Sequence, residues 1–511
     1  MVINMSEFLK ECKPGLAEAK AIAGAGEYDL IPVSMELFSD EITPVNLLRK
    51  LKKVSEHCFI LESVENAEDN QKWGRYTFLG FSPKMEITAS NGRTFLKKAG
   101  DESAIVTDEN PNTVIQRILD LHRSPRLDFL PTFTGGLVGY FAYDYAKYSE
   151  KALCFAGEDE GEFNDVDLML MDKIIAFDNF RQKIVIIVNM AVAAGDFEGE
   201  YRKAVQSLLD IERIIIEGEP CAHEPARLKS EFRGLFTREE YCSMVERAKN
   251  HIKEGDIFQA VLSNRFDADF EGSILDAYRV LRTINPSPYM FYFGSNNLEI
   301  AGASPETLVK LQDGDLFTYP LAGTRPRGST DEEDSSLEKE LLSDQKELSE
   351  HNMLVDLGRN DLGKISEFGS VKVDKYLQIL RFSHVMHIGS TVSGKIRKDF
   401  TGLDAVNAVL PAGTLSGAPK IRAMQIINEL EGNKRGIYGG AIGYLDFTGN
   451  MDTCIAIRVA YKRNGKVFVR SGAGIVAESV PDSEYNECIN KSKAVVCALE
   501  TAHKMGGAVL D

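Results

Sequence analysis

The stretch IYGGAIGYLDFTGNMDTCIAIRVAYKRNGKVFVRSGA, residues 437–473, decides the fold of this chain of 511 residues. It contains three apolar runs, at residues 437–446, 453–462 and 466–473, with glycine-containing turns between them, and a helical pattern follows at residues 483–504. Short apolar runs separated by turn residues are typical of strands joined as hairpins. The pattern therefore predicts an α+β fold with antiparallel sheets rather than strictly alternating βαβ units.

Upstream of this stretch the chain shows the same mixture of strands and helices. Strand-like runs fall at residues 58–61, 76–80, 183–189, 257–266, 290–294 and 299–303, and helical periodicity falls at residues 6–23, 112–122, 195–215, 238–254 and 273–285. Thr237 is the expected N-cap of one helix, and Ser335 with Glu338 has the spacing of a capping box that opens another helix, to about Gly358.

A polar segment with two prolines, residues 217–236, separates two regions of the chain. It is typical of a connection between domains. We therefore predict an N-terminal region over residues 28–190 and a larger domain over residues 235–500, which agrees with a length sufficient for two or more domains.

Composition excludes several classes of function. The formal net charge of -18 and the pI of about 5.1 disfavour binding to nucleic acids or to anionic membranes. The eight cysteines are scattered without a C-x-x-C pair, so reduced thiols are expected rather than disulfides or a zinc site. No 18-residue apolar run and no signal-peptide pattern is present, which predicts a cytoplasmic protein without a membrane span.

Two pairs of glutamates are candidates for metal binding. Glu347 and Glu350 are three residues apart on a predicted helix, and Glu484 and Glu487 repeat that spacing near the C-terminus. Each pair lies on one helix face, and four carboxylates that meet are suitable ligands for a hard divalent cation. The alternative interpretation is that both pairs lie on solvated helix faces.

An acid and two histidines are candidates for proton transfer. Glu306 follows a predicted strand in the segment Ser-Pro-Glu, where a partly desolvated carboxyl can act as a general acid. His384 and His387 lie close together in the sequence and are candidates for a base or a metal ligand. The alternatives are an acid in a surface turn and histidines buried in the core.

Three glycine-rich segments, residues 320–325, 411–420 and 471–474, are candidates for anion binding. Glycine lets backbone N–H groups approach an anion closely, and Arg458 and Lys491 can pair with carboxylates of the same ligand. None of the segments has the spacing of a phosphate-binding loop, and ordinary turns are the alternative interpretation.

Taken together, the motifs resemble those of the chorismate-utilising enzymes. The resemblance over residues 235–500 rests on PLAGTRPR (320–327), HNMLVDLGRND (351–361), SHVMH (383–387), PAGTLSGAPK (411–420), Gly472–Gly474 and EYNECINK (484–491). The N-terminal motifs FILES (59–63), WGRYTFLG (73–80) and TGGLVGYFAY (134–143) look like those of anthranilate synthase large subunits. The resemblance implies a layered α/β/α architecture with large antiparallel sheets, and an N-terminal β-rich region packed on the chorismate-binding domain.

Two positions distinguish between the reactions of this family. Aminodeoxychorismate synthases carry a nucleophilic lysine where this chain has Ala322, and isochorismate and salicylate synthases carry a water-activating lysine where it has Gln259. Neither side chain can take over the role of the lysine. The resemblance therefore implies the reaction that uses ammonia and eliminates pyruvate, in tryptophan biosynthesis; the alternatives are aminodeoxychorismate synthase component I and a non-catalytic amino-acid-binding sensor.

The resemblance also assigns roles to residues. It implies Mg²⁺ bound by Glu350 and Glu487 with support from Glu347 and Glu484, Glu306 as the acid for the C4 oxygen of chorismate, His387 as the base for the C2 proton, and Thr414 in the catalytic set. The implied substrate-binding residues are Gly323, Thr324, Tyr438, Arg458, Gly472, Ala473, Gly474 and Lys491.

A partner is implied because the chain lacks the residues of a glutaminase. Cys454, in the segment DTCIA, has no flanking glycines, and no His-x-Glu couple occurs. We therefore expect a separate glutamine amidotransferase subunit that supplies ammonia, in a heterotetramer of two large and two small subunits.

A regulatory site is implied by two further segments. Ser63, at the end of Leu61-Glu62-Ser63, and Pro288, Tyr289 and Met290 resemble the tryptophan-binding residues of the family. A hydroxyl, a proline, an aromatic ring and an adaptable methionine are suitable for an indole amino acid. The alternative interpretation is a strand end that packs on a proline-rich turn.

Overall fold

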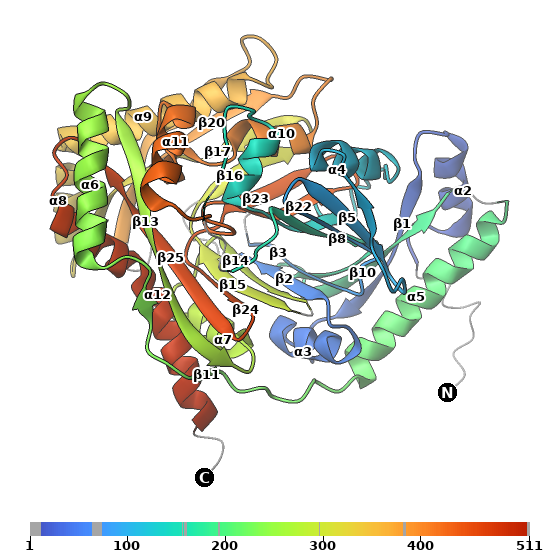
Figure 1. Cartoon of the computed structure of the whole chain (residues 1–511). Helices are drawn as coiled ribbons and strands as arrows, with labels where there is room; N and C mark the ends of the chain where they lie inside the picture. Colours follow the sequence, from blue (N-terminus) through green and yellow to red (C-terminus); the bar gives the residue numbers. More distant parts are fainter. Residues whose placement is uncertain are drawn as a thin grey trace.

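The computed structural model describes residues 12–63, 74–155, 157, 161–192, 195–295, 297–381 and 385–507. Two large antiparallel sheets form the centre of the molecule, and helices cover the outer faces of both (Figure 1). The predicted α+β fold with large antiparallel sheets is confirmed.

The first sheet has 13 strands. They are β1 (Leu30–Phe38), β2 (Cys58–Glu62), β3 (Tyr76–Phe81), β9 (Lys173–Asp178), β10 (Lys183–Ala191), β11 (Arg227–Leu228), β12 (Arg233–Gly234), β13 (Gln259–Glu271), β14 (Tyr289–Gly294), β15 (Leu298–Ser304), β21 (Gly417–Ala418), β24 (Val459–Arg463) and β25 (Lys466–Ile475). Their order is β1-β10-β9-β3-β2-β14-β15-β24-β25-β13-β11, and β12 and β21 also pair with β13.

The second sheet has 12 strands. They are β4 (Met85–Ser90), β5 (Arg93–Lys98), β6 (Ile105–Thr107), β7 (Gly136–Phe141), β8 (Val166–Met171), β16 (Thr307–Gln312), β17 (Asp315–Thr318), β18 (Leu321–Pro326), β19 (Lys372–Arg381), β20 (Val385–Lys395), β22 (Ala441–Asp446) and β23 (Met451–Ile455). Their order is β18-β20-β17-β16-β23-β22-β7-β8-β4-β5-β6, and β19 also pairs with β20.

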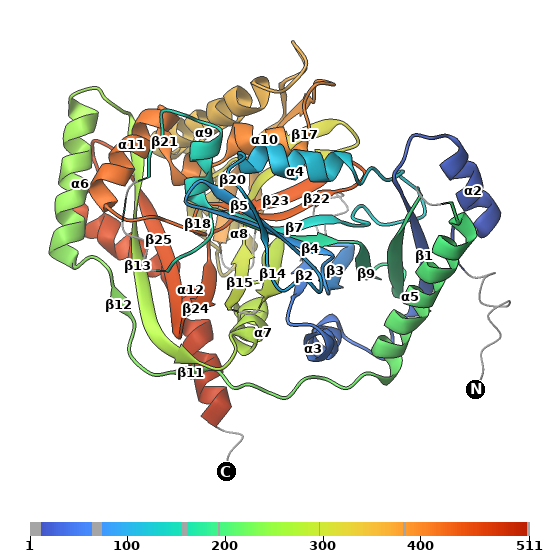
Figure 2. The same ribbon diagram turned by 45° about the vertical axis from the view of Figure 1, so that its right-hand side comes forward.

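The helices lie outside the sheets. They are α2 (Leu16–Gly24), α3 (Pro44–Val54), α4 (Pro111–Asp120), α5 (Phe197–Glu217), α6 (Arg238–Lys253), α7 (Leu275–Ile284), α8 (Asp331–Ser343), α9 (Gln345–Gly363), α10 (Gly402–Val409), α11 (Lys420–Glu431) and α12 (Pro481–Gly507), with short 3₁₀ turns η1 (Tyr143–Tyr148) and η2 (Gly413–Leu415). Helices α2 and α5 lie at the opposite end of the molecule from α6 in both views (Figures 1 and 2). None of the described helices is long and apolar enough to span a membrane.

The three largest apolar clusters hold these layers together. Helices α3, α5, α7 and α12 pack on the outer face of the first sheet, and α4, α9 and α10 pack on that of the second. Between the sheets lies an aromatic core that includes Phe78, Phe133 and Tyr444, with ring centroids of Phe133 and Tyr444 4.2 Å apart. The β layer between the helices is thus a pair of facing sheets, as expected where each sheet has an apolar inner face.

Both sheets contain strands from the two regions separated by residues 217–236. Strand β2 pairs with β14, with Glu62 opposite Met290, and β7 pairs with β22, with Gly139 opposite Gly443. The separating segment itself runs along the outside of the molecule to β11 (Figures 1 and 2).

Two local predictions are wrong for identifiable reasons. The helix expected from Ser335 begins earlier, because Thr330 caps α8 by accepting a bond from the Glu333 backbone, and it breaks before Asp344 caps α9. The strand expected at residues 453–462 is two strands in different sheets, β23 and β24, because Arg458 between them has a positive φ of 51°. By contrast, the predicted cap Thr237 is confirmed and forms a full capping box on α6.

Candidate active site

Glu306 lies in the turn between β15 and β16, where it is half-buried. Its backbone carbonyl accepts a bond from Ile455 N at 3.0 Å, and its carboxylate accepts one from the Thr414 hydroxyl at 3.1 Å. Burial raises the pKa of Glu306 to about 7, although the Thr414 bond and the charges of Lys491 and Arg458 act in the opposite direction. A carboxyl with such a pKa is protonated often enough near neutral pH to act as a general acid.

His387 lies on β20, opposite a bulge in β18. The register shifts between Ala322 and Thr324, and Gly323 between them has a φ of 70°, a conformation that favours glycine. The bulge directs the Gly323 carbonyl to His387 Nδ1 at 3.0 Å, and the Thr324 hydroxyl lies 3.0 Å from the same nitrogen. A carbonyl accepts only, so Nδ1 carries the proton and the lone pair lies on Nε2.

The histidine is held in its neutral form. Burial lowers the pKa of His387, and the charge of Arg458 acts in the same direction, whereas the Gly323 carbonyl opposes them. Because the charge of Arg458 also acts on Glu306, the acid, the histidine and this arginine share one site. A neutral imidazole beside a cation is suitable as a base for an anionic substrate.

Strand β25 forms a glycine-lined wall. A Cβ added to Gly472 would lie 2.5 Å from the Leu262 carbonyl, and one added to Gly474 would lie 2.6 Å from the Gln259 amide nitrogen. At Gly472, where the obstacle is backbone, only glycine fits, whereas at Gly474 the Gln259 side chain would have to move; the Tyr438 hydroxyl lies beside Gly472. Glycine at these positions thus allows β13 and the Gln259 side chain to approach the backbone of β25 closely.

Two cations act on Glu306, and one of them contacts this wall. Lys491 on α12 donates to the Gly472 carbonyl at 3.2 Å and pairs with Glu487 at 2.7 Å. Arg458 has its φ in the left-handed region, and its guanidinium contacts the Asn285 side chain at 3.5 Å. The predicted substrate residue Ala473 differs from its neighbours, because its methyl group packs in the core against α6 and α11, so only its backbone faces β13.

The four glutamates predicted to bind metal approach one another from α9 and α12. Burial raises the pKa of Glu350, and the charges of Glu347 and Glu487 raise it further. Burial and the charge of Glu487 likewise raise the pKa of Glu484. No three of the four have oxygen atoms within 4.8 Å of one another, so the carboxylates face a common region without forming a closed set of ligands.

A second site lies between the two sheets. A cavity of about 680 Å³ is lined by all four residues predicted to bind tryptophan: Ser63, Pro288, Tyr289 and Met290. The Ser63 hydroxyl is buried and has no hydrogen-bond partner among the residues that the structure describes. A cavity of this size is typical of small-ligand sites, and a buried orphan hydroxyl requires an explanation.

Sequence reasoning missed most of the polar lining of this cavity. Arg126, Lys310 and Asp452 contribute to it, and the Tyr289 hydroxyl donates to Asp452 at 2.8 Å. A charged residue within an apolar strand pattern, such as Asp452, is the signal that marks such positions. His384, the other histidine of the predicted pair, lies outside the described residues.

Together, the acid, the neutral histidine, the glycine wall and the cations define a class of enzyme that transfers protons to and from a small anionic substrate. The family model described as chorismate binding enzyme matches residues 39–496. The chain therefore belongs to the chorismate-binding enzyme family, as its motifs predicted.

Full-length relatives refine this assignment. The chain is 44% identical to anthranilate synthase component 1 of Acetivibrio thermocellus, covering 96% of this chain and 99% of that protein. It is 43% identical to the protein of the same name from Aquifex aeolicus, covering 93% of this chain and 96% of that protein.

Solved structures agree on the fold. Anthranilate synthase component I from Streptococcus pneumoniae matches with a TM-score of 0.73 and 37% identity, covering 90% of this chain and 98% of that chain. The menaquinone-specific isochorismate synthase from Escherichia coli has the same fold, with a TM-score of 0.69 at 19% identity, covering 95% of this chain and 98% of that chain.

Proposed function

We propose that this chain converts chorismate and ammonia to anthranilate and pyruvate, as the large component of an anthranilate synthase. The observation that carries the proposal is the full-length identity of 44% to a protein of that name, combined with a site that retains an acid and a base. Gln259, beside the glycine wall, is an amide and cannot activate water as a base, and Ala322 cannot act as a nucleophile. These two positions disfavour the related reactions.

In the first step, ammonia adds to C2 of chorismate while the C4 hydroxyl leaves. The C2–N bond forms, the ring double bonds shift, and the C4–O bond breaks. Glu306 donates its proton to the departing oxygen, which leaves as water. The pKa of about 7 makes this proton available, and the Thr414 hydroxyl orients the carboxyl.

In the second step, His387 Nε2 takes the proton from C2. The electron pair of that C–H bond completes the aromatic ring as the C3–O bond breaks, and the released enolate is protonated to pyruvate. The lowered pKa of His387 keeps it neutral for this task, and the Gly323 carbonyl holds the ring by its Nδ1 proton.

The substrate carries two carboxylates, and the site offers groups for both. Backbone N–H groups of the glycine wall, the Tyr438 hydroxyl and the Arg458 guanidinium are suitable donors. Lys491, which contacts Gly472, lies between this wall and the acidic residues of α9 and α12.

The acidic residues fit a divalent cation. Their mutual repulsion, visible in the raised pKa of Glu350, is the kind that a cation offsets. Mg²⁺ commonly uses only one or two protein carboxylates and completes its octahedron with water and substrate, so a closed set of ligands is not required. Glu350 and Glu487 would hold the ion, supported by Glu347 and Glu484, and the bound ion would neutralise the ring carboxylate.

Ammonia requires a source, and we propose a glutamine amidotransferase subunit. The name component 1 carried by the relatives agrees with a partner component. The chain has no glutaminase motif of its own, and the heterotetramer of two large and two small subunits stays a prediction. The lone chain should then use ammonium salts but not glutamine.

We also propose that tryptophan binds in the cavity between the sheets and inhibits the enzyme. The Ser63 hydroxyl, which bonds none of the described residues, faces a cavity with Pro288 and Tyr289 in its wall and can bond a ligand there. Inhibition requires that tryptophan bind an inactive arrangement more tightly than the active one. At this cavity β2 pairs with β14, and β14 in turn pairs with β15. The turn that follows β15 carries Glu306, so the cavity and the acid are linked through neighbouring strands.

Product analysis tests the main proposal. Purified chain with chorismate, Mg²⁺ and ammonium chloride at alkaline pH should form anthranilate and pyruvate in equal amounts. Replacing ammonium with glutamine should give no product. An aminodeoxychorismate product, or chorismate left unchanged, would contradict the assignment.

The metal is tested with Glu350→Ala, with Glu429→Ala on the exposed surface as the matched control. Activity of the first variant should be lost while its circular dichroism spectrum and its tryptophan binding are retained, because only the carboxylate that holds the cation is removed. Near-normal turnover of Glu350→Ala in the presence of a chelator would rule out the metal role.

A further inference from the structure

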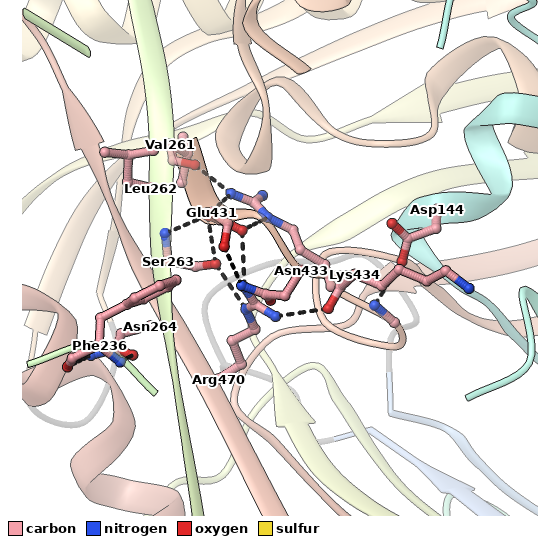
Figure 3. Close-up of polar contacts among 12 residues, drawn as sticks. Asp144, Phe236, Val261, Leu262, Ser263, Asn264, Glu431, Asn433, Lys434 and Arg470 are labelled. Carbon is pink, nitrogen blue, oxygen red and sulfur yellow. Dashed lines mark hydrogen bonds and ion pairs between the residues drawn. The ribbon is translucent and has the colours of Figure 1, made fainter. Parts of the chain in front are cut away.

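Behind the glycine wall lies a buried cluster of three ionised side chains, Glu431, Arg435 and Arg470. All three side chains are at most 2% exposed. Figure 3 shows the Glu431 carboxylate between Ser263 of β13 and the guanidinium of Arg470. None of the motifs that predict the site contains this set.

The Glu431 carboxylate is fully bonded. One oxygen accepts from the Ser263 backbone at 2.8 Å, from the Ser263 hydroxyl at 2.9 Å and from Arg435 Nη2 at 2.6 Å. The other accepts from Arg435 Nε at 3.0 Å and from Arg470 Nη2 at 2.9 Å. The attraction of the two guanidiniums lowers the pKa of Glu431 against the opposing effect of burial.

Arg435 connects this carboxylate to the turn that carries Thr414. Its Nη1 donates to the Leu415 carbonyl at 2.7 Å, and its Nη2 donates to the Val261 carbonyl. The Tyr143 ring lies 4.6 Å from the guanidinium and fixes its plane. The neighbour of Leu415 is Thr414, which donates to the catalytic acid.

Arg470 connects the same carboxylate to the glycine wall. It lies on β25 on the same face as Gly472 and Gly474, because side chains alternate along a strand. Its Nε donates to the Ser263 hydroxyl at 2.8 Å, and Ser263 is the strand partner of Gly472. Its Nη1 donates to the Lys434 carbonyl at 3.1 Å, within the turn that leads to Tyr438.

We propose that Glu431, Arg435 and Arg470 form a positioning unit for the reaction, which sets the placement of Thr414, and so of the proton on Glu306, relative to the glycine wall. The unit touches neither substrate nor reacting atoms. This inference rests on the proposed function, since it assigns residues that serve the same site.

Stability alone does not account for such a cluster. A buried ion network is often no more stabilising than apolar side chains of the same volume, because each charge loses its hydration. The geometry of the cluster is more specific than its stability, because a guanidinium donates hydrogen bonds in fixed directions in one plane. A lysine ammonium does not reproduce these directions. Here these directions end on three separate segments, β13, η2 and the turn at residues 432–436, and so fix the placement of these segments relative to one another.

The test is a mutant cycle on the full chain, measured by ammonia-dependent anthranilate formation with Mg²⁺. Arg435→Lys keeps the charge but loses the fixed donation to the Leu415 carbonyl, and kcat/KM should fall by about fivefold, no more than in Thr414→Val, because misplacing the hydroxyl cannot cost more than removing it. In the double variant with Thr414→Val, the two losses should not multiply, because both act through the same hydroxyl.

Lys52→Met is the matched control. Lys52 is a half-buried cation that pairs with Glu299 at 3.0 Å beneath the first sheet, and no bond to the site is found for it among the described residues. It should lower the thermal midpoint by at least as much as Arg435→Lys and change kcat/KM by less than about twofold, since stability effects at distant sites are independent of catalysis.

The positioning role is wrong if the two losses in kcat/KM multiply in the double variant. It is also wrong if kcat/KM falls no further in Arg435→Lys than in Lys52→Met. Either result would leave the proposed function intact. Absence of anthranilate formation by the wild type would instead remove the proposed function itself. If Arg435→Lys does not fold, Ser263→Ala replaces it, because that change removes only the hydroxyl bonded to Glu431 and Arg470; the same cycle with Thr414→Val then decides.

Discussion

The chorismate site and the cavity between the sheets are built in opposite ways. All predicted catalytic and substrate-binding residues, from Glu306 to Lys491, come from the C-terminal region of the chain. The cavity takes Leu61–Ser63, residues 74–76 and Phe78 from the N-terminal region and residues 288–291 and 442–444 from the C-terminal one. The first site is defined by local motifs, whereas the second exists only where β2 pairs with β14.

This difference determines how each site responds to change. Single side chains carry the chemistry of the first site, so removing one should stop a step without altering the cavity. The second site depends on strand register, because a shift of one residue would turn Tyr289 from the cavity to the opposite face of the sheet. Variants at one site should therefore leave the other working, and the following predictions test that separation.

The largest effect is expected from Glu306→Gln. The amide cannot donate the proton that the C4 oxygen requires, so kcat should fall by about a thousandfold, within the range for general acids. Tryptophan binding, measured by calorimetry, should stay unchanged, and Glu429→Gln on the exposed surface of α11 is the control. Loss of tryptophan binding together with turnover would show that the two sites are not separate.

A smaller loss is expected from His387→Ala. Ammonia should still add to chorismate, because Glu306 is intact, but pyruvate release should slow by about a hundredfold without the base. Chromatography of the reaction should then show an accumulated amino intermediate. Complete loss of chorismate consumption, with no intermediate, would contradict a role confined to the second step.

Ser63→Arg changes the cavity and should leave the chorismate site unchanged. The arginine fills the cavity, so the tryptophan concentration for half inhibition should rise at least about tenfold, a typical coupling, while uninhibited turnover stays near that of the wild type. Ser63→Ala, which removes only the hydroxyl, is the control and should weaken inhibition less. Equal inhibition of all three forms would exclude the cavity as the regulatory site.

Thr414→Val should have the smallest effect, and it is best seen in the pH profile. The Thr414 hydroxyl lowers the pKa of Glu306, so its removal should raise that pKa further. The acid must be protonated, and activity is lost as pH rises through its pKa; the alkaline limb, corrected for free ammonia, should therefore move to higher pH. Thr414→Ser keeps the donor and should restore the wild-type limb, whereas a limb that moves to lower pH would contradict this role.

Sequence alone predicted much of this site because its residues stand in short, ordered motifs. The fold class followed from strand-like runs such as residues 437–473, and Thr237 was identified as a cap because it directly precedes a helical pattern. The pKa of Glu306 was beyond such reasoning, because it depends on burial by segments distant in sequence.

The failures have the same cause. The strand is interrupted at Arg458 because the residues before it pair in one sheet and the residues after it pair in the other. The local sequence pattern is that of a single strand and does not indicate this interruption. The cluster around Glu431 was also missed, although Arg470 stands in the apolar run VFVRSG, where a charged residue on a buried strand indicates a partner inside the protein. Only the tertiary structure identifies that partner.

The pairing of early with late strands has a consequence for how the chain is made. A ribosome completes β2 and β7 long before β14 and β22, their neighbours in the finished sheets, leave the exit tunnel. The average contact thus spans a long separation along the chain, which slows folding and leaves strand edges open during synthesis. We expect the nascent polypeptide to rely on chaperones until its last strands emerge, and fragments that end before β22 to aggregate.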